Sequence, residues 1–163
     1  MAATLYFAAN GVSPTTAAQV AVTTGTAIKS LLQVATPSTV EIAVIEWGIS
    51  FDGSAAATPI KVELLQTDVA ATVTSVTPTL WNDPQGPASL CVGGTTATGH
   101  SASAEGTITA VRMFDVQFIA PTNQYVKQFP LGREPQVPIS KFLRIRVTAA
   151  AAVNAYCYVI WEE

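Results

Sequence analysis

The stretch that most constrains this chain is residues 40–52, which read V-E-I-A-V-I-E-W-G-I-S-F-D. Apolar side chains occupy every odd position from 43 to 51, whereas positions 46, 48, 50 and 52 are acidic or small. Successive side chains of a strand point to opposite faces, so this period of two predicts a β-strand with one face in a core. The even positions of the first half are apolar too. We therefore expect that half to be covered on both sides.

Turn signals divide the rest of the chain into further segments with β character. In residues 60–67, Ile60, Val62 and Leu64 alternate with charged residues, as in a half-buried strand. Residues 27–35 fit a strand or a single helical turn, and we favour the strand. Residues 93–106 read as a long polar loop. The other expected strands are residues 19–24, 72–77, 89–92, 107–120, 126–129, 140–148 and 153–161.

This spacing of roughly eight to ten strands predicts an all-β fold, a single-domain antiparallel β-sandwich that is jelly-roll-like. The domain is expected to span residues 1–163. Residues 1–11, with the apolar run at 5–7, form either a first strand or an N-terminal arm that packs on a neighbour. Trp47 and Phe118 lie on the apolar faces of long strands, so we predict that both are in the core between the sheets.

The chain carries few charges for its size. Charged residues make up 12% of it, about half the usual share of roughly 25%. The net charge of −3 argues against nucleic-acid binding, and we expect neither a secretory signal nor a membrane-spanning segment. Abundant Ala and Val, with strands apolar on two faces, leave more apolar surface than one sandwich hides. This predicts a homo-oligomer with a second face for a larger partner, and residues 5–7 and 93–106 are the segments expected to reach a neighbour.

Residues that could support catalysis are present but scattered. His100, the only histidine, lies in T-G-H-S-A-S, which lacks the nucleophile-elbow pattern G-x-S-x-G. A carboxylate pair could support glycoside hydrolysis, although a strand carboxylate that faces solvent is the commoner situation. We expect no enzyme activity, no catalytic residue, no cofactor and no metal site. The carboxylates considered are Glu41, Glu46, Glu63 and Asp115.

Three further residues stand out without forming a motif. Arg112 interrupts the apolar face of a long strand. It pairs with a buried carboxylate, is turned outward by a bulge, or crosses a subunit interface, and the sequence leaves all three open. Cys91 and Cys157 are far apart in the sequence, and we favour two free thiols in a protein made in a reducing cytoplasm.

Two stretches are distinctive together. Residues 45–65 read I-E-W-G-I-S-F-D-G-S-A-A-A-T-P-I-K-V-E-L-L, and residues 128–163 begin Q-F-P-L-G-R-E-P-Q-V-P and continue to K-F-L-R-I-R-V-T-A-A-A-A-V-N-A-Y-C-Y-V-I-W-E-E. They resemble small β-rich virion proteins of tailed bacteriophages, of the capsid decoration type. The resemblance implies a protein on the capsid exterior of the virion, made in the host cytoplasm, that binds and stabilises the lattice of the major capsid protein, often as a trimer. It transfers no functional residue.

Two alternatives to this function remain. A phage tail or fibre component has a similar composition and pattern. A carbohydrate-binding β-sandwich module would use exposed aromatic side chains, for which the candidates are Trp47, Trp81 and Tyr125, although aromatic residues on strands are usually in the core.

Overall fold

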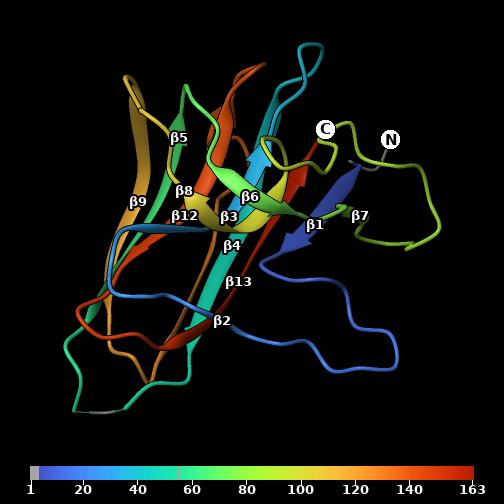
Figure 1. Ribbon diagram of the computed structural model, residues 1–163. Helices are drawn as coiled ribbons and strands as arrows, with labels where there is room; N and C mark the ends of the chain where they lie inside the picture. The colour runs from blue at the N-terminus through green and yellow to red at the C-terminus, as the bar shows by residue number, and fades with distance from the viewer. Residues whose placement is uncertain (1–3, 55) are drawn as a thin grey trace.

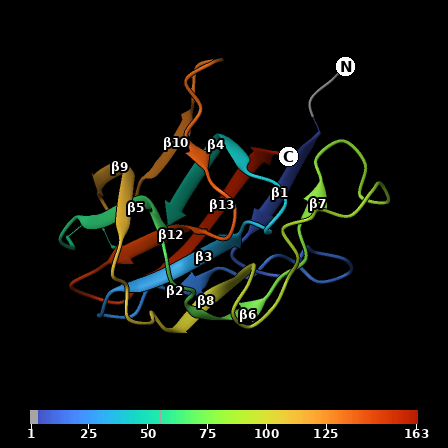
Figure 2. The ribbon, with the colours of Figure 1, turned by 90° about the horizontal axis from the view of Figure 1, so that it is seen from above.

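The computed structural model describes residues 4–54 and 56–163, which form thirteen strands in two antiparallel sheets. Figures 1 and 2 show the sheets as two layers packed face to face. The described residues contain no helix, and hence no helix that could cross a membrane. The predicted all-β sandwich is therefore confirmed. Residues 1–3 of the predicted arm lie outside the described part of the chain.

The first sheet, called sheet A, has β4 and β13 near its centre. Its strand order is β10 (Gln124–Gln128), β4 (Ile42–Phe51), β13 (Asn154–Glu162), β1 (Leu5–Ala9) and β7 (Thr79–Leu80), and the short strands β11 (Gln136–Val137) and β2 (Val22–Thr23) pair with β4 and β13.

The second sheet, sheet B, places β12 between β3 and β5. Its strand order is β6 (Thr72–Ser75), β8 (Gly99–Ala104), β3 (Lys29–Ala35), β12 (Phe142–Thr148), β5 (Ile60–Thr67) and β9 (Val111–Ile119).

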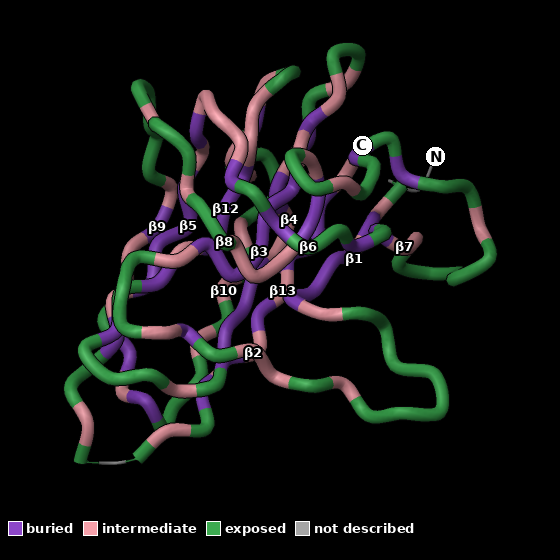
Figure 3. Tube along the Cα trace, in the orientation of Figure 1, coloured by how far each residue is buried: buried purple, intermediate pink, exposed green. Residues whose placement is uncertain are grey.

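The hydrophobic core fills the space between the sheets. Trp47 of β4 and Trp161 of β13 are the largest apolar side chains in it, and both are fully buried. Alternate residues of β5 and β12 meet them from sheet B, among them Val62 and Ile145. Figure 3 shows the buried segments along the central strands and the exposed ones in the connecting loops. The prediction for Trp47 is thus confirmed.

The two apolar faces in the first half of β4 have a different cause from the one expected. Pairing with β13 shifts by one residue between Glu46 and Val44, so Ile45 is an extra residue in a β-bulge. Such a bulge changes which face the later residues of the strand occupy. Ile42 and Val44 point into the core before it, whereas Trp47 does so after it. A change of face, and not a second covering layer, accounts for the pattern.

A second bulge corrects the prediction for Phe118. Pairing of β9 with β5 shifts so that Phe114 is an extra residue. Beyond this point the odd positions face the core and the even positions face outward, and Phe118 lies opposite Lys61 with 72% of its surface exposed. The sequence pattern assigned Phe114 and Phe118 to one face because it assumed an uninterrupted period of two.

Two other segments differ from expectation. Residues 5–9 are strand β1, paired with both β13 and β7, so this run has its place within the sandwich. The polar stretch 93–106 contains strand β8, which pairs with β3 and β6. Gly99 lets β8 lie close to β6, because a Cβ at this position would overlap the carbonyl of Thr74. Residues 89–92 form no strand, whereas residues 27–35 contain β3, as favoured.

Candidate functional site

The residues considered for catalysis lie on different parts of the sandwich. His100 is on β8, where its Nδ1 lies 2.8 Å from the Ser101 hydroxyl, and burial, assisted by the charge of Lys29, lowers its pKa. Glu46 lies on the outer face of sheet A and Glu63 on the outer face of sheet B. Across the described residues, no three His, Cys, Asp or Glu side chains gather as metal ligands.

Glu41 and Asp115 complete the set of carboxylates. Glu41 is exposed just before β4, whereas Asp115 is buried on the core side of β9. The carboxylates therefore face four different environments and form no catalytic pair. Cys91 and Cys157 are free, as predicted, and both are buried. Burial raises the pKa of each thiol well above its usual range.

Asp115 joins the two sheets at the edge formed by β9 and β10. Its carboxylate accepts a hydrogen bond from the Tyr125 hydroxyl at 3.0 Å and forms an ion pair with Lys127 at 3.3 Å, both from β10 of sheet A. Gln117 donates to the same carboxylate at 2.9 Å. This cluster closes the edge of the sandwich, so Asp115 has a structural partner for its charge.

Arg112 makes a parallel link at the same edge. Its guanidinium donates to the main-chain carbonyl of Gln136 on β11 and lies 4.7 Å above the Phe114 ring. It therefore connects sheet B to sheet A without a buried carboxylate. The β9 bulge lies next to Arg112 but does not turn it outward, since its guanidinium reaches Gln136 of sheet A.

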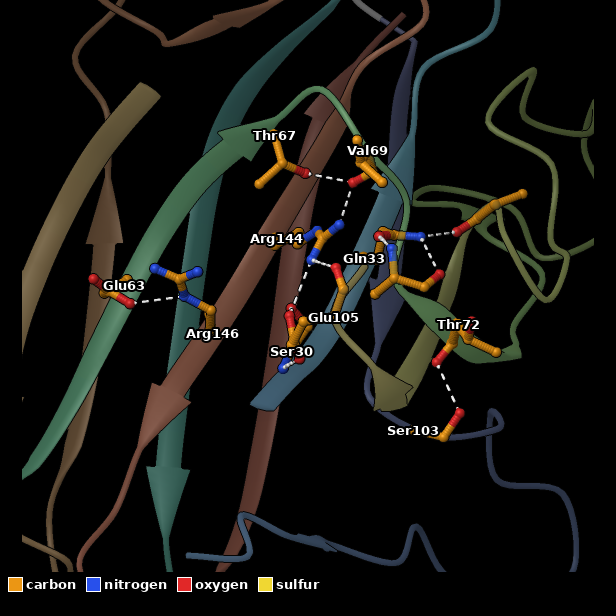
Figure 4. A network of polar contacts seen from close by, with 12 residues as sticks. Ser30, Gln33, Glu63, Thr67, Val69, Thr72, Ser103, Glu105, Arg144 and Arg146 are labelled. Atoms are coloured by element: carbon orange, nitrogen blue, oxygen red, sulfur yellow. Dashed lines mark hydrogen bonds and ion pairs between the residues drawn. The ribbon is translucent and has the colours of Figure 1, made fainter. Parts of the chain in front are cut away.

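Arg144 on the outer face of sheet B is the centre of a buried polar network that the sequence did not predict (Figure 4). The arginine is completely buried. Its Nη1 donates to the Glu105 carboxylate at 2.9 Å and to the Glu105 carbonyl at 3.0 Å, and its Nη2 donates to the carbonyl of Val69. The same carboxylate accepts hydrogen bonds from the main chain and the hydroxyl of Ser30.

Two segments, residues 68–71 and 105–110, cover this network, and we call them the cover loops. The carboxylate of Asp68 accepts hydrogen bonds from the main-chain amides of Thr109 and Ala110, which ties one loop to the other. The Thr109 hydroxyl also donates to this carboxylate. This bond, together with those from the two amides, lowers the pKa of Asp68 to about 2. Gln33 of β3 fixes the first loop, since its side chain accepts from the amide of Ala71 at 2.8 Å.

The outer face of sheet A carries a row of aromatic rings. We call Trp81, Phe7, Tyr158 and Tyr156 the aromatic row. Successive ring centroids lie 5.4, 5.8 and 6.3 Å apart. Tyr158 lies across Gly48 and donates its hydroxyl to Glu46 at 2.6 Å, and burial, together with this carboxylate, raises its pKa. Only Trp81 of these four was among the aromatic residues considered from the sequence for binding. The alternation of Tyr156 and Tyr158 with core residues is the signal that could have found them.

Exposed apolar side chains gather on β9, the edge strand of sheet B. Val111, Met113 and Phe118 are 60%, 61% and 72% exposed, and the half-buried Val116 shares their outward face. We call these four residues the β9 strip. The aromatic residues proposed from the sequence for sugar binding form no common exposed surface. Trp47 and Tyr125 pack together on the core side of sheet A, with ring centroids 5.4 Å apart, and only Trp81 lies on the outer face.

Comparisons with protein-family models, with curated proteins and with solved structures give no match to this chain. The resemblance to capsid decoration proteins therefore stays a prediction.

Proposed function

We propose that this protein is a non-enzymatic structural protein that self-associates and binds to a larger protein shell, as the resemblance to capsid decoration proteins implies. The observation that carries the proposal is the β9 strip. It places three strongly exposed apolar side chains on one face of a strand at the edge of a sheet, with the half-buried Val116 between Met113 and Phe118. Contiguous exposed apolar surface on a soluble protein usually marks an interaction site.

The form of β9 favours contact through side chains over extension of the sheet. Its bulge at Phe114 and its inward-pointing Asp115 are both features that discourage a further strand from pairing at an edge. The side chains of the strip remain available to pack against another surface. Association through the strip leaves the outer face of sheet A free for a second partner, the major capsid protein. The trimer is proposed from the resemblance alone.

The test compares the intact chain with variants of the strip. Light scattering during size-exclusion chromatography gives the oligomeric state, and co-sedimentation with shells assembled from the major capsid protein of the same virus gives shell binding. We expect Met113→Lys with Phe118→Lys to dissociate the oligomer. Val126→Lys is the matched control for the oligomeric state, because Val126 is 53% exposed on β10, the edge strand of the other sheet.

Two outcomes would count against the proposal. A protein that stays monomeric at high micromolar concentration and does not sediment with shells has no such role. An oligomer that survives the double substitution is not formed through the β9 strip.

A further inference from the structure

A groove of about 430 Å³ lies on the outer face of sheet A, between the sheet and the segment that joins β1 to β2. This segment stands away from the sheets in Figure 1 and is mostly exposed in Figure 3. The groove thus has a wall that is largely independent of the core. Its floor includes Phe7, Ala9, Ser50 and Tyr156, and its wall includes Ser13 and Gln19.

The lining combines aromatic rings with neutral polar groups. Phe7 and Tyr156 present rings from β1 and β13, while Ser13, Ser50 and Gln19 supply hydroxyl and amide groups. None of the described residues that line the groove is charged. A charged ligand would find no compensating group there, whereas a neutral ligand with both apolar and hydroxyl-bearing faces fits this chemistry. Sugar rings have this character, because their C–H faces stack on aromatic rings and their hydroxyls form hydrogen bonds.

Gln19 supplies an independent observation. Its side-chain Nε2 is buried and has no hydrogen-bond partner among the described residues. A buried donor without a partner is unfavourable. A rotation of the Gln19 side chain toward the groove would let this donor bond to a ligand oxygen. Gly11 makes room for the amide, because a Cβ at that position would overlap Nε2 of Gln19.

We propose that this groove binds a neutral carbohydrate, with a sugar ring against Phe7 and Tyr156 and its hydroxyls bonded to Gln19 and the two serines. The volume lies in the range of roughly 300–1,000 Å³ that is typical of small-ligand sites, which suits a short oligosaccharide. A second copy of the chain is a poorer occupant, since an apolar segment would leave the amide of Gln19 unpaired. The inference does not depend on the proposed shell role.

The experiment is an amide-resolved NMR titration of the full chain with maltotriose, cellotriose, chitotriose and galactobiose at millimolar concentration. We expect at least one of these sugars to shift the Gln19 side-chain resonances saturably. Gln19→Ala and Ser13→Trp should each weaken binding roughly tenfold or more, the first by removing a donor and the second by filling the groove. Both positions lie on the outer segment, so the fold should persist. Leu131→Ala, at a 98% exposed position in the turn after β10, should leave affinity unchanged.

Other results would overturn the inference. If none of the four sugars causes a saturable shift, the groove does not bind neutral carbohydrates. Binding that Gln19→Ala and Ser13→Trp leave intact places the ligand elsewhere. If no sugar binds and these variants change the oligomeric state, the groove is a contact between subunits. Shell sedimentation of the same variants is measured separately, so failure of the sugar site is distinguishable from failure of the shell role.

Discussion

The outer face of sheet B carries a buried charged side chain, Arg144, whereas the outer face of sheet A carries aromatic rings that are partly exposed. On sheet B, Arg144 is fully buried because Glu105 and the cover loops satisfy its guanidinium at several points. On sheet A, the aromatic row runs from Trp81, just after β7, across strands β1 and β13, and Trp81 is 51% exposed.

The difference shows two uses for the back of a sheet. A buried charge stays favourable only while its partners are in place, so the Arg144 network requires one specific set of partners and is unsuited to binding another molecule. Aromatic rings need no such complement, and a face made of them remains available for binding. We therefore expect substitutions in the Arg144 network to cost the most stability and substitutions in the aromatic row to cost less.

The largest effect is expected for Arg144→Ala. This change leaves the Glu105 carboxylate half-buried without its charge partner and should lower the free energy of unfolding by about 3–5 kcal/mol. Denaturant titration measures the loss. Arg144→Met combined with Glu105→Leu should cost less than the single change, because it removes both charges. A loss below about 1 kcal/mol for Arg144→Ala would show that the network contributes little.

A smaller effect on sheet A is expected for Gly48→Ala. A Cβ at Gly48 would lie 2.6 Å from Cε1 of Tyr158, so the ring must move and its bond to Glu46 is lost. We expect a loss of about 1–2 kcal/mol, measured by denaturant titration. Ser50→Ala, two residues along the same face of β4, should change stability by less than about 0.5 kcal/mol. Equal losses for both variants would contradict this explanation.

Acid should weaken sheet B through Glu63 and Asp68. Burial alone would raise the pKa of Glu63, but hydrogen bonds from Arg146 and Lys61 lower it below its usual value, and the pKa of Asp68 is lowered to about 2. Carboxyl groups with a lowered folded-state pKa stabilise the fold above their unfolded pKa of about 4, and this contribution is lost as the pH falls toward about 2.

Thermal unfolding between about pH 5 and about pH 2 measures this dependence. The variant with Glu63→Gln and Asp68→Asn should be less stable than the natural chain at pH 5 and should lose less on acidification. An unchanged pH dependence would mean that other groups control the acid response.

The smallest effects compare exposed aromatic residues on the two faces. Trp81→Ala should cost about 0.5–1.5 kcal/mol, because its ring packs on Phe7 at 5.4 Å. In the monomer, Phe118→Ala should change stability by less than about 0.5 kcal/mol, since the side chain is exposed there. Calorimetric unfolding of both variants gives the comparison. A larger loss of stability for Phe118→Ala than for Trp81→Ala would contradict this prediction.

Alternation along the chain was enough to predict the sandwich and most of its strands, because each long strand has one face in the core. It failed where a bulge adds a residue. Ile45 and Phe114 look like ordinary members of their strands, yet each changes the face of the residues after it, and Phe118 was misplaced for that reason. Bulge positions depend on pairing with a partner strand, which a local pattern does not contain.

The polar network around Arg144 could not be predicted from the sequence, for a related reason. Arg144 and Arg146 look equivalent in the sequence, since both occupy the polar face of β12. Only Arg144 lies beneath the cover loops, whereas Arg146 pairs with Glu63 and remains partly exposed. The aromatic row poses the same problem, because Phe7, Trp81 and Tyr158 come from segments distant in the sequence.

The distances in sequence across the Arg144 network have a kinetic consequence. Arg144 is 39 positions from Glu105 and 75 from Val69, and Gln33 reaches 38 positions to Ala71. Contacts of such long separation cannot form until the strands of sheet B have met. We therefore expect the network to form after the rate-limiting step of folding, so that its loss accelerates unfolding while the refolding rate stays nearly constant. The lifetime of the folded protein then depends on loops at the back of a sheet more than on the speed with which that sheet assembles.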